Sequence, residues 1–144
     1  MNAVEIAVSM FEKGHSCSQA VFTAFAEKAG LDYATAVKIA SGFGGGMGRM
    51  GGTCGALTGA FMALGLKSGG ADAESKEKTY ALVRRCAARF KTRHGSLQCK
   101  DLLGCDIGTT EGQKLIKEKN LHSTICVGIV QATAEILEEL LEDS

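Results

Sequence analysis

The feature that most constrains this chain is a glycine-rich stretch around Cys54. Five glycines flank that cysteine between residues 48 and 59. The glycines before Thr53 can turn the backbone through positive φ, a conformation that costs other residues steric energy. Thr53 is a favourable N-cap, and an apolar, alanine-rich run follows it. The stretch therefore predicts a sharp turn into a helix, with Cys54 in the first helical turn.

A cysteine at such a position is chemically distinctive. The free N–H groups and the dipole at a helix N-terminus favour a thiolate over a thiol. A thiolate there can act as a nucleophile, exchange electrons or bind a metal. The position of Cys54 therefore indicates chemistry rather than packing.

Apolar residues recur at helical spacing along almost the whole chain, and no strand pattern is convincing. Because the chain contains no proline, its reversals depend on residues such as glycine and aspartate. Asp32 is predicted to be the N-cap of the third helix. The pattern predicts an all-α fold, a single-domain helical bundle over residues 1–144. The predicted helices cover residues 3–11, 17–29, 33–40, 53–66, 73–93, 98–103, 110–120 and 122–142.

The helix over residues 53–66 is predicted to be the buried centre of the bundle. Its residues are apolar or small on nearly every face, which is typical of a helix surrounded by others. Gly55, Gly59 and Ala63 repeat at four-residue spacing, which would let a neighbouring helix approach closely, by analogy with membrane helices. In helix 73–93, the residues predicted to face inward are Tyr80, Val83, Ala87 and Phe90.

The composition argues against several classes of partner. Sixteen basic residues balance sixteen acidic ones, and tryptophan is absent, so nothing favours nucleic acid or an anionic membrane. Residues 1–13 lack a basic segment and carry Glu5, so they do not resemble a signal peptide. The apolar run 54–66 is too short to span a bilayer. We therefore expect a cytoplasmic protein without a membrane span. In a reducing cytosol, the presence of six cysteines favours catalytic, redox or metal-binding roles over structural disulfides.

Four of the six cysteines fall in four different predicted elements. Cys17 and Cys126 lie on the apolar stripes of their helices. Cys54 opens the central helix, and Cys99 lies in a short polar connection. Only tertiary folding could bring them together, as in sites built between facing helices. Local spacing alone identifies no site, because the chain has no C-x-x-C pair and no C-x-x-C-H motif for covalent haem.

The other candidate residues have simpler explanations. Cys86 lies among apolar residues and is predicted to pack in the core. Cys105 lies in a loop; it could be a resolving thiol near Cys99, but we expect a bystander. Arg49 would either stabilise a nearby thiolate or anionic ligand, or point into solvent. Each histidine precedes a cysteine, but structural roles are favoured for all three, namely His15, His94 and His122.

The four cysteines together resemble the pattern of a redox-active protein family named C…GCAxxG…C…C. The segment Cys54-Gly-Ala-Leu-Thr-Gly59 resembles its central motif, except that Thr53 stands where the family name has glycine. The segment starting at His15 resembles its first cysteine helix. The segments around Cys99 and Cys126 resemble its third cysteine segment and its C-terminal helix.

This resemblance covers essentially the whole chain. It implies that Cys17, Cys54, Cys99 and Cys126 form the site. It leaves Cys86 and Cys105 outside it. The cysteine-bearing part of the family is similar to the C-terminal region of split-Soret cytochromes, for which an iron–sulfur centre has been suggested. The haem-attachment half of those proteins has no counterpart here.

A metal centre is the first of three hypotheses. Cys17, Cys54, Cys99 and Cys126 would hold an iron–sulfur cluster, or alternatively zinc, with metal–sulfur bonds of about 2.3 Å. Three amides would donate hydrogen bonds to sulfur and tune the reduction potential, those of Gly51, Gly52 and Gly55. The function would be electron transfer or redox sensing.

The second hypothesis is a metal-free dithiol–disulfide protein. Cys54 would be the attacking thiolate, with Cys17, Cys99 or Cys126 as its resolving partner. The third hypothesis is a helical interaction domain whose cysteines only pack. The sequence identifies neither the redox partner protein nor the oligomeric state, although a homodimer is compatible with it. It also contains no acid–base pair that would define an enzyme reaction.

Overall fold

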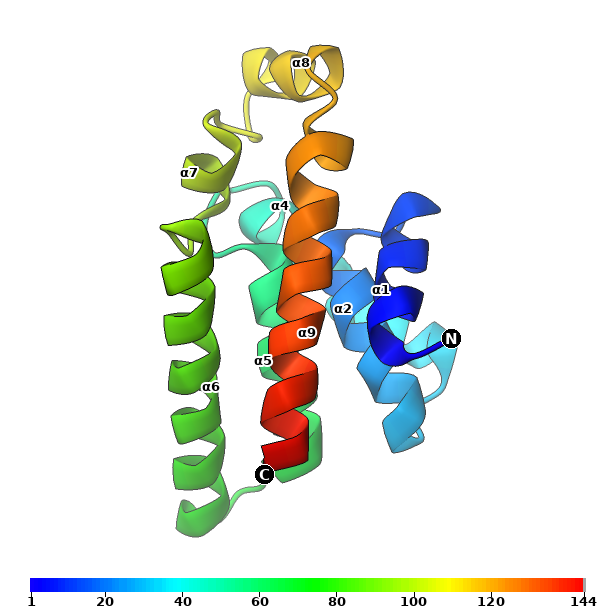
Figure 1. The fold of residues 1–144 in the computed structure, drawn as a ribbon, viewed down its shortest axis with the longest axis vertical. Helices are drawn as coiled ribbons and strands as arrows, with labels where there is room; N and C mark the ends of the chain where they lie inside the picture. Colours follow the sequence, from blue (N-terminus) through cyan, green and yellow to red (C-terminus); the bar gives the residue numbers. More distant parts are fainter. Residues whose placement is uncertain (144) are drawn as a thin grey trace.

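A computed structural model describes residues 1–143, and these residues form a bundle of helices (Figure 1). The all-α prediction is confirmed. Among the described residues, the nearest approach to a β-sheet is one isolated bridge between Thr53 and Gln98. The helices are α1 (Ala3–Glu12), α2 (Cys17–Ala26), η1 (Glu27–Ala29), α3 (Tyr33–Ala40), η2 (Ser41–Phe43), α4 (Gly44–Met47), α5 (Gly55–Ser68), α6 (Ala73–His94), α7 (Cys99–Leu103), α8 (Thr110–Glu118), η3 (His122–Cys126) and α9 (Val127–Asp143).

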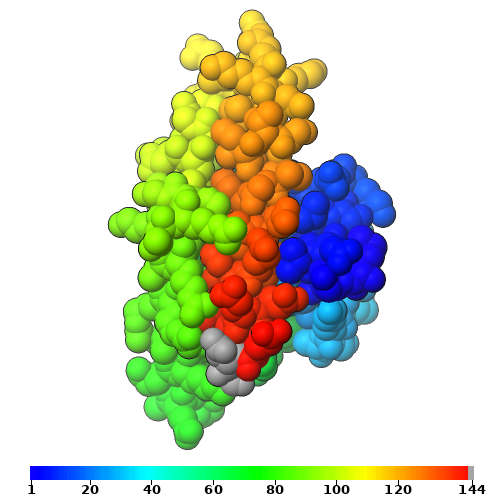
Figure 2. Space-filling view, in the orientation of Figure 1, coloured from blue at the N-terminus to red at the C-terminus, as the bar shows by residue number. Residues whose placement is uncertain are grey.

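Helix α5 lies at the centre of the core, as its sequence predicts. It packs against α2 on one side and against α6 and α9 on the others. Its inward residues Ala56, Leu57 and Leu64 are completely buried. In Figure 1, α9 passes in front of α5, with the long α6 on one flank and α1 and α2 on the other. The space-filling view shows α9 at the surface between α6 and α1 (Figure 2).

Side-chain caps fix the starts of most long helices. Asn2 caps α1, and Asp32 caps α3 by accepting a hydrogen bond from the Thr35 amide, as predicted. Ser16 caps α2 through a capping box, in which its side chain and that of Gln19 bond reciprocally to the backbone. These local interactions explain why the starts of α2 and α3 can be located from the sequence.

Three local predictions are wrong. Thr53 is not the N-cap of α5, because it pairs with Gln98 and the helix begins one residue later, after Cys54. Tyr80 does not face inward; it is 53% exposed, and the buried residues of α6 are Leu82, Cys86 and Phe90. The last predicted helix does not start as an α-helix, because η3 is a π-helical turn that precedes α9.

The predicted close approach of a helix to α5 is confirmed at Gly59. A Cβ atom built on Gly59 would lie 2.8 Å from the Ser18 carbonyl oxygen and 3.3 Å from the Phe22 nitrogen, both in α2. Because these atoms belong to a helix backbone, they cannot move aside as a flexible side chain could. Gly59 therefore sets the distance between α2 and α5, and through it the position of Cys17 at the start of α2.

Two alanine substitutions in α5 should have opposite effects. We expect Gly59→Ala to lower the free energy of unfolding by about 2–3 kcal/mol, because α2 must shift to admit the methyl group. No atom lies within 4 Å of a Cβ built on Gly65. Gly65→Ala should therefore raise the free energy of unfolding by about 0.5–1 kcal/mol, because alanine has the higher helix propensity. Urea unfolding measures both. Equal effects of the two substitutions would contradict the packing described here.

No helix within residues 1–143 combines the length and the apolar character that crossing a membrane requires.

Candidate functional site

Four cysteines from separate parts of the chain line one small cavity. Its other lining residues, Gly55, Leu102, Leu103 and Ile129, offer no polar side chain. The cavity has a volume of about 30 Å³, which is enough for roughly two water molecules. The cysteines are those singled out in the sequence, Cys17, Cys54, Cys99 and Cys126.

Cys17 is positioned by the start of α2 and by the glycine-rich loop. It is the first residue of that helix, directly after the Ser16 cap, and it is partly exposed. Its sulfur accepts hydrogen bonds from the backbone of Gly45, of Ser18 and of Cys17 itself. A Cβ built on Gly55 would lie 2.7 Å from this sulfur, so only glycine leaves room for it. This clash gives a physical reason for the glycine that follows Cys54.

Backbone pairing places Cys54 and Cys99 side by side. The Cys54 amide donates to the Leu97 carbonyl at 2.8 Å, and the Cys99 amide donates to the Gly52 carbonyl at 2.6 Å. These bonds flank the bridge between Thr53 and Gln98, so two short antiparallel segments hold the starts of α5 and α7 together. Residues separated by more than forty positions in the sequence thus share a cavity wall.

Cys126 reaches the cavity from the end of the π-helical turn η3. In that turn, the Val127 amide bonds to the His122 carbonyl five residues earlier, which widens the turn relative to an α-helix. His122, four residues before Cys126, does not line the cysteine cavity. The His122 ring instead contacts Phe11 edge-on, and Cys126 lines the cysteine cavity.

The hydrogen bonds around the pair favour a thiolate at Cys17 over one at Cys54. The Cys54 thiol donates a hydrogen bond to the Cys17 sulfur, and this bond, aided by the backbone donors, lowers the pKa of Cys17 from 9.0 to about 7 against the opposing effect of burial. The pKa of Cys54 is raised well above its usual value, first by Cys17 and then by burial. The Ala56 and Leu57 amides at the start of α5 oppose this rise only in part. These opposite directions favour Cys17 over the predicted Cys54 as the thiolate of the pair.

The other two cavity cysteines are thiols at neutral pH. Burial, followed by the charge at Cys17, raises the pKa of Cys99 to about 11 and that of Cys126 to about 12. Burial also raises the pKa of Cys86 to about 12, and this cysteine lies in the core as predicted. Cys17 is therefore the cysteine best suited to nucleophilic attack near neutral pH.

The glycine-rich loop serves the site differently from the prediction. The Gly51 and Gly52 amides do not face sulfur; they donate to the carbonyls of Gly45 and Gly46 within the loop, at 3.2 and 3.0 Å. Arg49 does not line the cysteine cavity either, and it lies in a separate hollow. The Gly45 amide, which does bond to the Cys17 sulfur, was not identified from the sequence. Its partner lies in α2, and no local pattern indicates that contact.

Neither Cys105 nor any of the three histidines lines the cysteine cavity. Cys105 packs with Cys99 and Cys126 in a second, smaller apolar cluster, and its thiol donates to the Gly112 carbonyl at 3.8 Å. His15 bonds to the Met10 carbonyl and the Tyr33 hydroxyl. His94 stacks edge-on against Phe90. These contacts agree with the structural roles expected for the histidines.

The four cavity cysteines offer a set of sulfur ligands that can be compared with those of known metal centres. Four thiols with no competing oxygen or nitrogen suit iron–sulfur or zinc chemistry. As far as residues 1–143 are concerned, however, no three histidine, cysteine, aspartate or glutamate side chains are grouped so that they could hold a metal ion. Within the cavity, one hydrogen bond joins two of the sulfurs, those of Cys17 and Cys54. The arrangement described is therefore that of a thiol pair with two further thiols beside it.

Comparison with known proteins gives one match. The model of a family described as "Putative redox-active protein (C_GCAxxG_C_C)" matches residues 15–140, which include all four cavity cysteines. Searches of curated proteins and of solved structures found no match.

Proposed function

This chain belongs to the C_GCAxxG_C_C family of redox-active proteins, and we propose that it acts as a dithiol–disulfide redox protein. Cys17 would be the attacking thiolate and Cys54 the resolving thiol. The observation that carries the proposal is the hydrogen bond from the Cys54 thiol to the Cys17 sulfur. It joins a nucleophile that is ionised near neutral pH to a second thiol in direct contact with it.

The first step is attack on a disulfide of a redox partner, either a protein or a small molecule. The Cys17 thiolate forms a bond to one sulfur of that disulfide. The bond between the two partner sulfurs breaks, and one of them leaves as a thiolate. Cys17 lies at the N-terminus of α2 and is partly exposed as a residue, whereas Cys54 is buried.

The second step forms a disulfide between Cys17 and Cys54. Cys54 loses its proton to solvent or to the departing thiolate, and its sulfur attacks the Cys17 sulfur. A Cys17–Cys54 disulfide forms, and the second partner sulfur leaves. In total, two protein thiols are oxidised and one partner disulfide is reduced to two thiols, with two electrons transferred.

The remaining walls of the cavity support this exchange. Cys99 and Cys126 stay protonated, so neither competes with Cys17 as a nucleophile near neutral pH. Leu102, Leu103 and Ile129 surround the sulfurs with apolar groups and limit the entry of water. Gly55 leaves the space that the Cys17 sulfur occupies.

The dependence of Cys17 on Cys54 can be tested by alkylation. A thiol with a lowered pKa is ionised above that pKa, so the rate of iodoacetamide labelling at Cys17 should rise with pH and reach its midpoint near pH 7. In Cys54→Ala the main donor is lost, and the midpoint should move up by at least about one unit. Mass spectrometry of the peptide that contains Cys17 gives the rate at this site alone.

Cys54→Ser is the matched control for this experiment. A serine hydroxyl can still donate a hydrogen bond to the Cys17 sulfur, so the midpoint should stay closer to pH 7 than in the alanine variant. An unchanged midpoint in Cys54→Ala would show that Cys54 does not activate Cys17, and the proposed pair would then fail.

A second candidate function is electron transfer or redox sensing through an iron–sulfur cluster. The observation in its favour is that four cysteines, rather than two, line one cavity that lacks other donors. A two-iron cluster takes two cysteines at each iron, so its ligands need not surround a single point. Cys17 and Cys54 would bind as one pair and Cys99 and Cys126 as the other. When bound, such a cluster would supply one-electron chemistry.

A further inference from the structure

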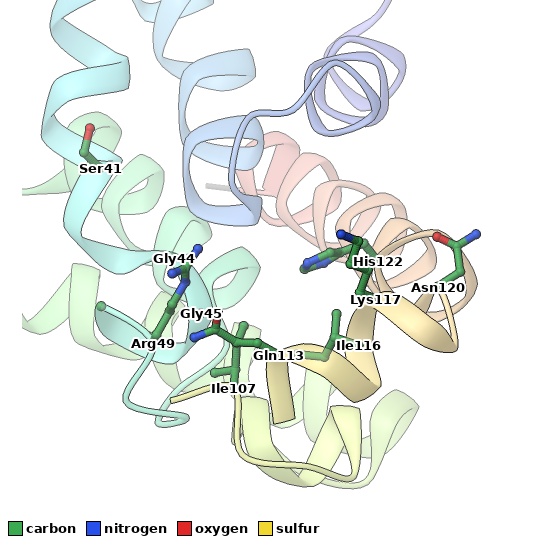
Figure 3. Close-up of a pocket in the computed structure, with 11 residues that line it drawn as sticks. Ser41, Gly44, Gly45, Arg49, Ile107, Gln113, Ile116, Lys117, Asn120 and His122 are labelled. Carbon is green, nitrogen blue, oxygen red and sulfur yellow. The ribbon is translucent and has the colours of Figure 1, made fainter. Parts of the chain in front are cut away.

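We propose that a hollow beside the glycine-rich loop, separate from the cysteine cavity, binds a small organic anion. The hollow has a volume of about 620 Å³, within the range of small-molecule sites. It opens between the loop that carries Gly44 and Gly45 and the segment formed by α8 and η3 (Figure 3). None of the four cavity cysteines lines it, so this inference does not rest on the proposed thiol chemistry.

The charges around the hollow favour an anion. Figure 3 shows Arg49 on the loop side, with Lys117 and His122 on the opposite side. No lining residue in the described part of the chain carries a carboxylate. Within that same part, no ion pair is formed by Arg49 or by Lys117. By contrast, Lys114, on the same helix as Lys117, pairs with Glu118 at 3.8 Å and does not line the hollow.

Arg49 is held in place by the backbone around it. Its own φ is +64°, in the left-handed region, which fixes an unusual direction for the side chain. A Cβ built on Gly45 would lie 2.9 Å from the Arg49 Cγ, so the absence of a side chain at Gly45 allows the arginine to lie along the loop. On the other side, a Cβ on Gly108 would lie 2.7 Å from the Arg49 carbonyl oxygen. The guanidinium is thus presented by a close-packed loop.

The base of the hollow is apolar. Ile107 and Ile116 lie between the two cationic sides in Figure 3, and both are buried. A few polar groups above an apolar base are typical of sites for small organic molecules. Cations on opposite sides suit a ligand with an anionic group at each end and a hydrocarbon body between them. The shared chemistry is that of a carboxylate or a phosphate, which arginine and lysine both recognise.

Isothermal titration calorimetry on the whole protein tests this proposal. The probes are glutarate, inorganic phosphate and the neutral glutaramide. We expect at least one of the two anions to bind with a dissociation constant of about 1 mM or lower, and the neutral amide not to bind. Binding of glutarate alone, or of phosphate alone, identifies the anionic group. In Arg49→Gln and Lys117→Gln, the affinity should fall about tenfold, as expected for a lost charged hydrogen bond.

The control variants separate charge and folding effects from recognition. Lys114→Gln removes the same charge from the same helix and should leave the affinity unchanged. Arg49→Gly suits the left-handed φ, so this variant should fold normally but lose affinity for the anion. Met47 also has a left-handed φ, +68°, but does not line the hollow, so Met47→Gly should fold and bind the anion normally. The proposal is overturned if neither anion binds, if glutaramide binds as well as glutarate, or if Lys114→Gln weakens binding as much as Lys117→Gln.

Discussion

Replacing Gly46 with alanine is expected to lower the free energy of unfolding by about 2–5 kcal/mol and to disrupt the cysteine cavity. The φ of Gly46 is +67°, which costs an alanine about 1–2 kcal/mol. The added Cβ would also lie 2.5 Å from the Gly52 nitrogen and 2.8 Å from the Cys99 Cβ. Overpacking of this kind typically costs a further 1–3 kcal/mol. Because the added methyl group would displace the Cys99 side chain, the cavity should open at the same time.

Gly48→Ala provides a control within the same loop. Gly48 has a similar left-handed backbone, with φ +59°, but a Cβ there meets only the Gly42 carbonyl oxygen, at 3.9 Å. We expect a loss of about 1–2 kcal/mol in the free energy of unfolding, from the backbone alone. Urea unfolding gives both values, and the labelling rate of Cys99 reports the state of the cavity. Similar losses in the two variants would show that Gly46 is not closely packed.

Much of the helical bundle could be predicted from the sequence because its determinants are local. The span of α3 follows from apolar spacing and from Asp32, which caps the helix three residues from its hydrogen-bond donor. The buried character of α5 follows from small and apolar residues on all its faces. The close approach at Gly59 follows from the spacing of small residues.

The start of α5 could not be predicted locally. Thr53 has the chemistry of an N-cap, but its pairing with Gln98 moves the cap to Cys54. That pairing joins segments more than forty residues apart, so no local pattern contains it. The same holds for the π-helical turn η3, which directs Cys126 toward the cavity and His122 away from it.

The identity of the thiolate cysteine also depends on tertiary contacts. Both Cys17 and Cys54 lie at helix N-termini, so the helix dipole does not distinguish them. The difference comes from the direction of the hydrogen bond between them and from the Gly45 amide. The family resemblance could identify the cysteines, but their individual roles depend on these contacts.

Substitution of Cys17 should have the largest effect on redox activity. Cys17→Ser should reduce thiol–disulfide exchange with a small disulfide to the background rate, because a serine hydroxyl is not ionised near neutral pH and cannot form a disulfide. Release of the coloured thiolate from a dithiobis(nitrobenzoate) reagent measures the rate. Cys105→Ser, outside the cavity lining, is the control and should retain nearly full activity. Retained activity in Cys17→Ser would assign the attacking thiolate to another cysteine.

The most direct test is to identify the bond formed on oxidation. The protein would be purified without oxygen, analysed for iron and sulfide, reduced, and treated with one equivalent of a small disulfide before peptide mapping by mass spectrometry. The account predicts a colourless protein that loses two thiols and gains one disulfide, between Cys17 and Cys54. A brown protein that contains iron and sulfide bound by its cysteines, or a disulfide that joins any other pair, would contradict it.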